Sequence, residues 1–204
     1  MKILVTAFDA FGDDSVNSSS EALDALFVPE ETASIVKLKL PTVFGKSEML
    51  LTDAIKEHKP DAVLCVGQAS GRAAITIERV AINIMDARIA DNEGFKPVDV
   101  PIEADAPAAY FSTVPIKAMV KAISEAGIPA EVSNTAGTYV CNRLLYGALH
   151  YIAVNSLPIR AGFIHVPCIP KQIEGMDKKP PAMEPELIVR ALEIAVRVTV
   201  TGGA

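Results

Sequence analysis

The sequence has too few cysteines for a disulfide-stabilised protein or a zinc-binding domain. Only three cysteines stand among its 204 residues, at positions 65, 141 and 168. An odd number cannot all pair within one chain, and their wide spacing matches no common zinc pattern. We therefore expect free thiols, no bound metal and a reducing, cytoplasmic environment.

Long hydrophobic runs and basic clusters are also missing. Without a stretch of about 18 apolar residues we expect no membrane span, and the short apolar run at the N-terminus lacks the cleavage site of a signal peptide. The net charge of −6 argues against a nucleic-acid partner. Half of the residues are apolar, which excludes intrinsic disorder. The length suits one domain, which we expect to span residues 1–204.

Apolar runs alternate with amphipathic segments along the chain. We expect strands at 2–7, 34–40, 62–66, 74–84, 130–133 and 162–166, and helices at 21–27, 45–58, 116–126, 139–155 and 187–198. This alternation indicates an α/β fold with a mostly parallel sheet. Residues 86–107 show little periodicity, and loops of this length are usually functional or mobile. We expect a mobile segment there that covers the substrate or contacts a neighbouring subunit.

The small number of histidines narrows the search for a general base. His58 ends a predicted helix, where it suits the helix dipole, and His150 lies within an amphipathic helix. His165 stands near the end of the apolar strand 162–166. Ligands of open α/β sheets bind at the carboxyl ends of strands. By position alone, His165 is either a catalytic base or a hydrogen-bonded core histidine.

The cysteines differ in context in a similar way. Cys65 stands inside a buried strand, where a thiol acts as a small hydrophobe, and Cys168 follows a proline. Cys141 falls in the first turn of the predicted helix 139–155. Free N–H groups and the helix dipole favour a thiolate there and can receive an oxyanion. Cys141 is therefore a candidate nucleophile, with a buried structural cysteine as the alternative.

A cysteine–histidine pair needs a third group that orients the imidazole. Glu78 is the one acidic residue in the otherwise apolar segment 74–82, so it is the candidate. The alternative for Glu78 is a local ion pair with Arg72 or Arg79.

Five blocks of sequence together carry a family pattern. They are AVLCVGQ at 62–68, ERVAIN at 78–83, DARIADNEG at 86–94, SNTAGTYVCN at 133–142 and GFIHVP at 162–167. In this order they resemble the pyroglutamyl peptidase type I (pyrrolidone-carboxylate peptidase) family of cysteine peptidases, and the resemblance covers nearly the whole chain. It implies an α/β/α sandwich with a mostly parallel twisted central sheet, commonly assembled as a tetramer.

The resemblance also implies an activity and the residues that perform it. The family removes N-terminal pyroglutamyl (5-oxoprolyl) residues from peptides through a thioester acyl-enzyme, without metal or cofactor. Cys141 corresponds to the nucleophile, His165 to the general base and Glu78 to its orienting acid. Arg88 corresponds to a residue near the oxyanion site. The pocket for the lactam ring corresponds to Phe8, Phe11, Asn17, Gln68, Ile89, Tyr139 and Val140.

The first loop departs from the family pattern. Ala10 stands where a proline is usual, and Asp13 where a glycine is usual. We expect these changes to weaken substrate binding more than they slow the chemistry.

The alternatives to this activity are a cysteine hydrolase of another small amide and a catalytically silent α/β ligand-binding module. The presence of Cys141, His165 and Glu78 together argues against a silent module. We expect a cytoplasmic homo-oligomer, a tetramer or dimer, that acts on N-terminally pyroglutamylated peptides and has no nucleic-acid or membrane partner.

Overall fold

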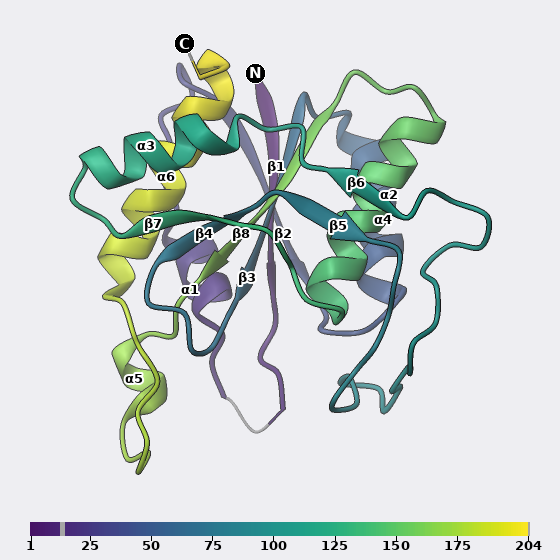
Figure 1. Cartoon of the computed structure of the whole chain (residues 1–204). Coiled ribbons are helices and arrows are strands. Elements are labelled where there is room, and N and C mark those ends of the chain that lie inside the picture. The colour runs from purple at the N-terminus through teal and green to yellow at the C-terminus, as the bar shows by residue number, and fades with distance from the viewer. Residues whose placement is uncertain (13–14, 204) are drawn as a thin grey trace.

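The computed structural model describes residues 1–12 and 15–203, and a six-stranded sheet lies between two layers of helices (Figure 1). The strand order is β2-β1-β3-β8-β4-β7. The strands are β1 (Lys2–Phe8), β2 (Ser34–Leu40), β3 (Ala62–Gln68), β4 (Ile75–Glu78), β7 (Ala130–Ser133) and β8 (Arg160–Val166). A separate antiparallel pair joins β5 (Val80–Ile82) with β6 (Ala109–Phe111). Asp13 lies outside the described residues.

Strand direction changes once across the sheet. Strands β2, β1, β3 and β8 run parallel, whereas β4 is antiparallel to β8 and parallel to β7. In the β4–β8 register Thr76 lies opposite His165. The mostly parallel α/β architecture expected from the sequence is confirmed.

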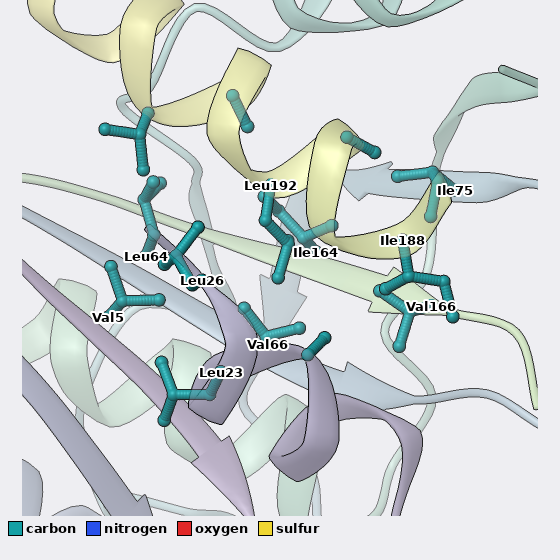
Figure 2. Close-up of a cluster of buried hydrophobic side chains, with 14 of the residues drawn as sticks. Val5, Leu23, Leu26, Leu64, Val66, Ile75, Ile164, Val166, Ile188 and Leu192 are labelled. Carbon is teal, nitrogen blue, oxygen red and sulfur yellow. The ribbon is translucent and has the colours of Figure 1, made fainter. Parts of the chain in front are cut away.

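Each face of the sheet has its own hydrophobic core. On one face α1 (Ser18–Ala25), α3 (Ile116–Glu125) and α6 (Pro185–Thr201) pack together. Figure 2 shows part of this core, in which side chains of β1, β3 and β8 meet those of α1 and α6. On the other face α2 (Lys46–His58) packs beside α4 (Val140–Val154). The short helix α5 (Pro170–Ile173) follows β8.

Alternation along β8 decides which way His165 points. Ile164 and Val166 belong to the core under α1 and α6, whereas Phe163 belongs to the core under α4. Successive strand residues point to opposite faces. His165 therefore points to the α4 face, together with Phe163, and the two rings lie 4.6 Å apart between centroids.

Two expectations about local structure are wrong. The segment 74–84 is not one strand: it divides at Arg79, because Arg79 N donates to Ser133 O of β7 while its carbonyl accepts from Ser112 N beyond β6. Helix α1 begins three residues earlier than expected. Its N-cap Asn17 accepts a 3.0 Å hydrogen bond from Ser19 N, a signal that apolar periodicity does not contain.

No helix in the described part of the chain is long and apolar enough to cross a membrane.

Candidate active site

Glu78 and His165 form a hydrogen-bonded pair on neighbouring strands. Since Thr76 lies opposite His165, Glu78 is diagonal to the histidine and on the same face, a spacing that long side chains can bridge. Glu78 Oε1 lies 2.7 Å from His165 Nδ1. Both side chains are buried, so the carboxylate fixes the imidazole ring and leaves Nε2 as the nitrogen that can exchange protons.

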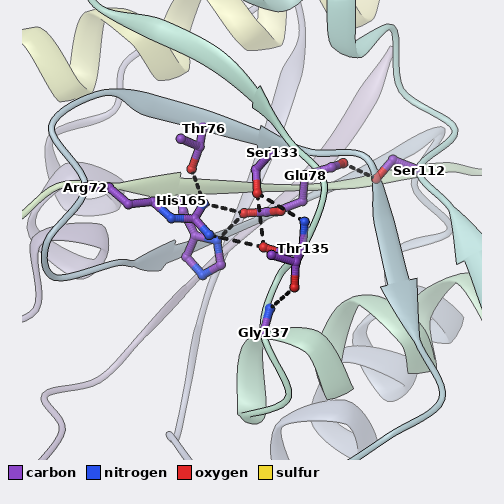
Figure 3. A network of polar contacts seen from close by, with 8 residues as sticks. All are labelled: Arg72, Thr76, Glu78, Ser112, Ser133, Thr135, Gly137 and His165. Carbon is purple, nitrogen blue, oxygen red and sulfur yellow. Dashed lines mark hydrogen bonds and ion pairs between the residues drawn. The ribbon is translucent and has the colours of Figure 1, made fainter.

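Arg72 binds the same carboxylate oxygen (Figure 3). Its Nη1 lies 2.6 Å from Glu78 Oε1, and its Nη2 donates to Thr135 O at 3.1 Å in the loop that leads into α4. Glu78 therefore contacts both His165 and Arg72, so the two alternatives that the sequence left open are compatible. Arg79 instead donates to Asn134 Oδ1 at 2.7 Å. Burial favours the neutral carboxyl, but the bonds from His165 and Arg72 outweigh it and lower the pKa of Glu78.

Cys141 lies in the first turn of α4, as its second residue, two positions after the N-cap Tyr139. The hydroxyl of Tyr139 donates to Ala90 O at 3.0 Å rather than to the helix. The first backbone N–H groups of a helix have no partner within the helix, so they can stabilise negative charge near the sulfur.

Gly67 leaves the space that Cys141 occupies. Gly67 lies opposite His165 in the β3–β8 register, and a Cβ added to it would be 3.2 Å from Cys141 Sγ. The sulfur is therefore beside the pair of strands that carries the histidine. The same Cβ would be 2.8 Å from the ring of Phe163, closer than real contacts allow.

Gly67→Ala is expected to lower kcat by roughly a hundredfold, because a misplacement of about 1 Å between reacting groups has that scale of effect. The measurement is steady-state kinetics on a protein whose circular dichroism matches that of the native chain. Ala69→Gly, two residues further along the chain and just beyond the end of β3, is the control and should keep its kcat. Unchanged kcat in Gly67→Ala would show that the sulfur does not depend on this space.

Burial and the neighbouring charges shift the pKa values of Cys141 and His165 in opposite directions. Burial raises the pKa of Cys141 to about 12, and the charge of Glu78 adds to the effect, while Arg72 opposes it. Burial also lowers the pKa of His165 below its usual 6.5, although Glu78 opposes this. The helix terminus therefore does not offset desolvation here. At neutral pH the site holds a thiol beside a neutral imidazole.

A cavity of about 570 Å³ opens above Cys141. Seven of its lining residues are among those expected from the family resemblance: Phe8, Phe11, Asn17, Gln68, Arg88, Ile89 and Tyr139. Thr42, Ser70, Asp86, Gly137 and Thr138 complete the lining with Cys141. Val140 is fully buried in the core under α4 and is not among the lining residues.

The segment 86–107 contributes to this cavity. Asp86, Arg88 and Ile89 line it, and whether the segment covers a bound substrate stays a prediction. The carboxylate of Asp91 anchors the segment, because it accepts hydrogen bonds from the backbone N–H groups of Phe44 and Phe95, both at 2.9 Å. The mobility of the segment stays a prediction.

Asn92 ties the segment 86–107 to the first loop, since its Nδ2 donates to Ala10 O at 3.0 Å. The effect expected of the altered first loop on substrate binding stays a prediction as well.

Arg72 has a larger place in the site than its position in the sequence indicates. It stands in a loop six residues before Glu78, and only the fold brings its guanidinium to the carboxylate and to Thr135. Its charge also lowers the pKa of His165.

We expect Arg72→Gln to lower kcat roughly tenfold, a part of the roughly 10²–10⁴-fold that general base catalysis contributes. The acid limb of kcat/KM should move to higher pH, because loss of the nearby charge raises the pKa of His165 and the base must be neutral to act. Arg79→Gln is the matched control and should keep the native pH profile. An acid limb that stays in place in Arg72→Gln would contradict the role given to Arg72.

A buried imidazole–carboxylate pair with a cysteine close to the same strands, at the carboxyl edge of an α/β sheet, provides the groups that a cysteine hydrolase uses. A model of the pyroglutamyl peptidase family matches residues 1–201. The chain is 54% identical to pyrrolidone-carboxylate peptidase 1 of Caldanaerobacter subterraneus subsp. tengcongensis, over 98% of each chain. The chain belongs to the pyroglutamyl peptidase family.

Solved structures agree with this membership. The crystal structure of pyroglutamyl peptidase I from Bacillus amyloliquefaciens is 48% identical and superposes with a TM-score of 0.95, covering 99% of this chain and 98% of that chain. A mutant pyrrolidone carboxyl peptidase from Pyrococcus furiosus is 45% identical with a TM-score of 0.93, covering 98% of this chain and 99% of that chain. The family resemblance in the sequence is thereby confirmed.

Proposed function

We propose that Cys141, His165 and Glu78 act as nucleophile, general base and orienting acid in the removal of an N-terminal pyroglutamyl residue from peptides. The observation that carries this proposal is the 2.7 Å bond between His165 Nδ1 and Glu78 Oε1, next to a cysteine on the wall of a cavity. Family membership supports the reaction, and this geometry supports the choice of residues.

Acylation begins from a neutral pair. His165 Nε2 takes the proton of the Cys141 thiol as the sulfur attacks the carbonyl carbon of the pyroglutamyl residue. The tetrahedral intermediate collapses when the imidazolium gives its proton to the leaving amine, and a thioester remains. Glu78 stabilises the imidazolium during this step because its own pKa is lowered and it stays ionised.

Deacylation uses the same base. His165 takes a proton from a water molecule, which attacks the thioester carbonyl and releases pyroglutamic acid. The sulfur leaves as a thiolate and recovers its proton from the imidazolium. Substrate, water and side chains supply every atom in both steps, so we propose no metal and no cofactor.

The first turn of α4 is the site proposed for the oxyanion. Its free N–H groups lie at the nucleophile, where negative charge develops on the carbonyl oxygen. Arg88 lines the same cavity and adds a positive charge.

The cavity suits an uncharged five-membered lactam. Phe8, Phe11 and Tyr139 offer aromatic surface to the hydrocarbon part of the ring, and the rings of Phe11 and Tyr139 lie 5.4 Å apart. Asn17 and Gln68 add polar groups to the lining. A pyroglutamyl N-terminus carries no ammonium, so it enters such a site without the cost of desolvating a charge.

The test is release of a fluorophore from a pyroglutamyl amide, with a glutaminyl amide as the comparison. Rapid turnover of the pyroglutamyl amide alone supports the proposal. Turnover of other small amides in its place would support the broader cysteine hydrolase, and no turnover of any amide would support a silent binding module.

We also propose that residues 1–204 work as one peptidase domain in a cytoplasmic homo-oligomer, a tetramer or dimer. The apolar side chains of Phe95, Val98 and Val100 are exposed on the segment 86–107 and provide a surface for a second copy. The three free cysteines fit a reducing compartment. Sedimentation velocity tests the assembly, and a monomer at micromolar concentration would contradict it.

A further inference from the structure

The side-chain amide of Gln68 is held by three hydrogen bonds at the rim of the cavity. Its Oε1 accepts from Ser18 N at 2.9 Å, from Ser18 Oγ at 3.1 Å and from Gln172 Nε2 at 2.8 Å. These bonds come from the start of α1 and from α5, two elements far apart in the sequence. The carbonyl of the amide is thus fully used inside the protein.

Backbone groups fix the orientation of Gln172. Its Oε1 accepts from Ile169 N at 3.0 Å, and its Nε2 donates to Val16 O at 3.0 Å as well as to Gln68. A backbone N–H can only donate and a backbone carbonyl can only accept, so the amide of Gln172 has one consistent orientation.

The orientation of Gln172 decides that of Gln68. With Gln172 Nε2 and Ser18 N both donating, the group of Gln68 that faces them must be its oxygen. Its Nε2 then points the other way, where Ser70 Oγ is 3.4 Å distant, a long contact. Gln68 and Ser70 both line the cavity. Gln68 therefore presents a hydrogen-bond donor to a bound molecule and withholds its acceptor.

We propose that Gln172 is a positioning residue that determines specificity, by locking the Gln68 amide with its N–H groups toward the cavity. A ring that binds here must bring an acceptor to this donor, as the carbonyl of a lactam does. A prolyl ring has no such carbonyl and leaves the donor unpaired, which is costly in a closed site. The identity of the ring rests on the proposed function, whereas the orientation of the amide does not.

Gln172→Glu replaces the donor that faces Gln68 by an acceptor while keeping the size of the side chain. A carboxylate still accepts from Ile169 N but can no longer donate to Gln68 Oε1. The carboxylate then attracts the N–H groups of Gln68 in opposition to the Ser18 donors, which draws the amide toward the orientation that places its oxygen opposite the lactam carbonyl. We expect KM for a pyroglutamyl amide to rise about tenfold to a hundredfold, with kcat changing less than about threefold.

Gln172→Met removes the donor without adding a charge. Ser18 alone then holds the Gln68 amide, so a smaller rise in KM, about threefold to tenfold, is expected. Lys171→Gln, a change at the exposed neighbouring position, is the control and should keep native values. The melting temperature of each variant shows whether it folds, and Gln172→Met provides the test where Gln172→Glu fails to fold.

A binding measurement separates this inference from the proposed function. The probe is 2-pyrrolidone, the bare lactam, and the readout is its protection of Cys141 against iodoacetamide, which needs no turnover. If 2-pyrrolidone protects Cys141 in the native chain and protects it less in Gln172→Glu, the result supports the proposed orientation of the Gln68 amide. This holds even where no peptide is cleaved. Equal protection and equal KM in the native chain and both Gln172 variants would overturn it, as would a loss confined to kcat.

Discussion

Replacing Cys141 by alanine is expected to lower kcat/KM for a pyroglutamyl amide by at least about 10⁴-fold, the scale seen when a nucleophile is removed from a catalytic triad. Alanine has no atom that can form the thioester, and His165 alone has only water to activate. The measurement is fluorophore release at enzyme concentrations high enough to detect a residual rate of that size.

The other two cysteines are the controls for this experiment. Cys65 is buried inside β3 and Cys168 is buried beyond the end of β8, where its sulfur lies 3.3 Å from Ser70 Oγ. Cys65→Ala and Cys168→Ala should keep most of the native kcat. An active Cys141→Ala protein, folded and free of contaminating peptidase, would end the thiol mechanism.

A prolyl amide is expected to be cleaved at least about 10⁴-fold less efficiently than the pyroglutamyl amide of the same fluorophore, because sites built around a substrate's polar groups discriminate on that scale. The proline ring lacks the carbonyl, and its nitrogen is a charged ammonium. Binding it would leave the amide N–H of Gln68 without an acceptor and would desolvate a charge against aromatic rings.

The comparison requires kcat/KM for both amides from one enzyme preparation. A cyclopentanecarbonyl amide, which has neither the carbonyl nor the charge, separates the two contributions and should fall between the other substrates. Discrimination below about 200-fold, the range of a simple difference in size, would show that the cavity recognises shape rather than the lactam.

The strands and the helix that carry His165 and Cys141 could be predicted from the sequence. The apolar runs that become β3 and β8 and the amphipathic face of α4 are strong local signals. These elements place His165 at the carboxyl edge of the sheet and Cys141 in a first helical turn, as expected. The positions of both residues depend mainly on the element that carries each one, and such elements can be recognised from periodicity.

The connections between elements could not be predicted in the same way. The contact of Glu78 with His165 depends on β4 running antiparallel to β8 in one register, and no local pattern encodes a register between strands so distant in sequence. The joint use of one carboxylate oxygen by His165 and Arg72 follows from the same register.

Burial opposes one effect that the sequence predicts. A position in the first turn of a helix is visible in the sequence, and it favours a thiolate on Cys141. The protein that surrounds the sulfur is supplied by distant segments, among them β3 with Gly67. Its desolvation raises the pKa of Cys141 to about 12, which reverses the local effect.

The position of β8 has a consequence for synthesis of the protein. The last strand in the chain inserts between β3 and β4, in the middle of the sheet. Until residues 160–166 have left the ribosome, β3 and β4 each have an unpaired edge. Open strand edges favour aggregation with other chains. The strand that closes these edges also carries His165, so protection from aggregation and enzymatic competence are gained in the same late step.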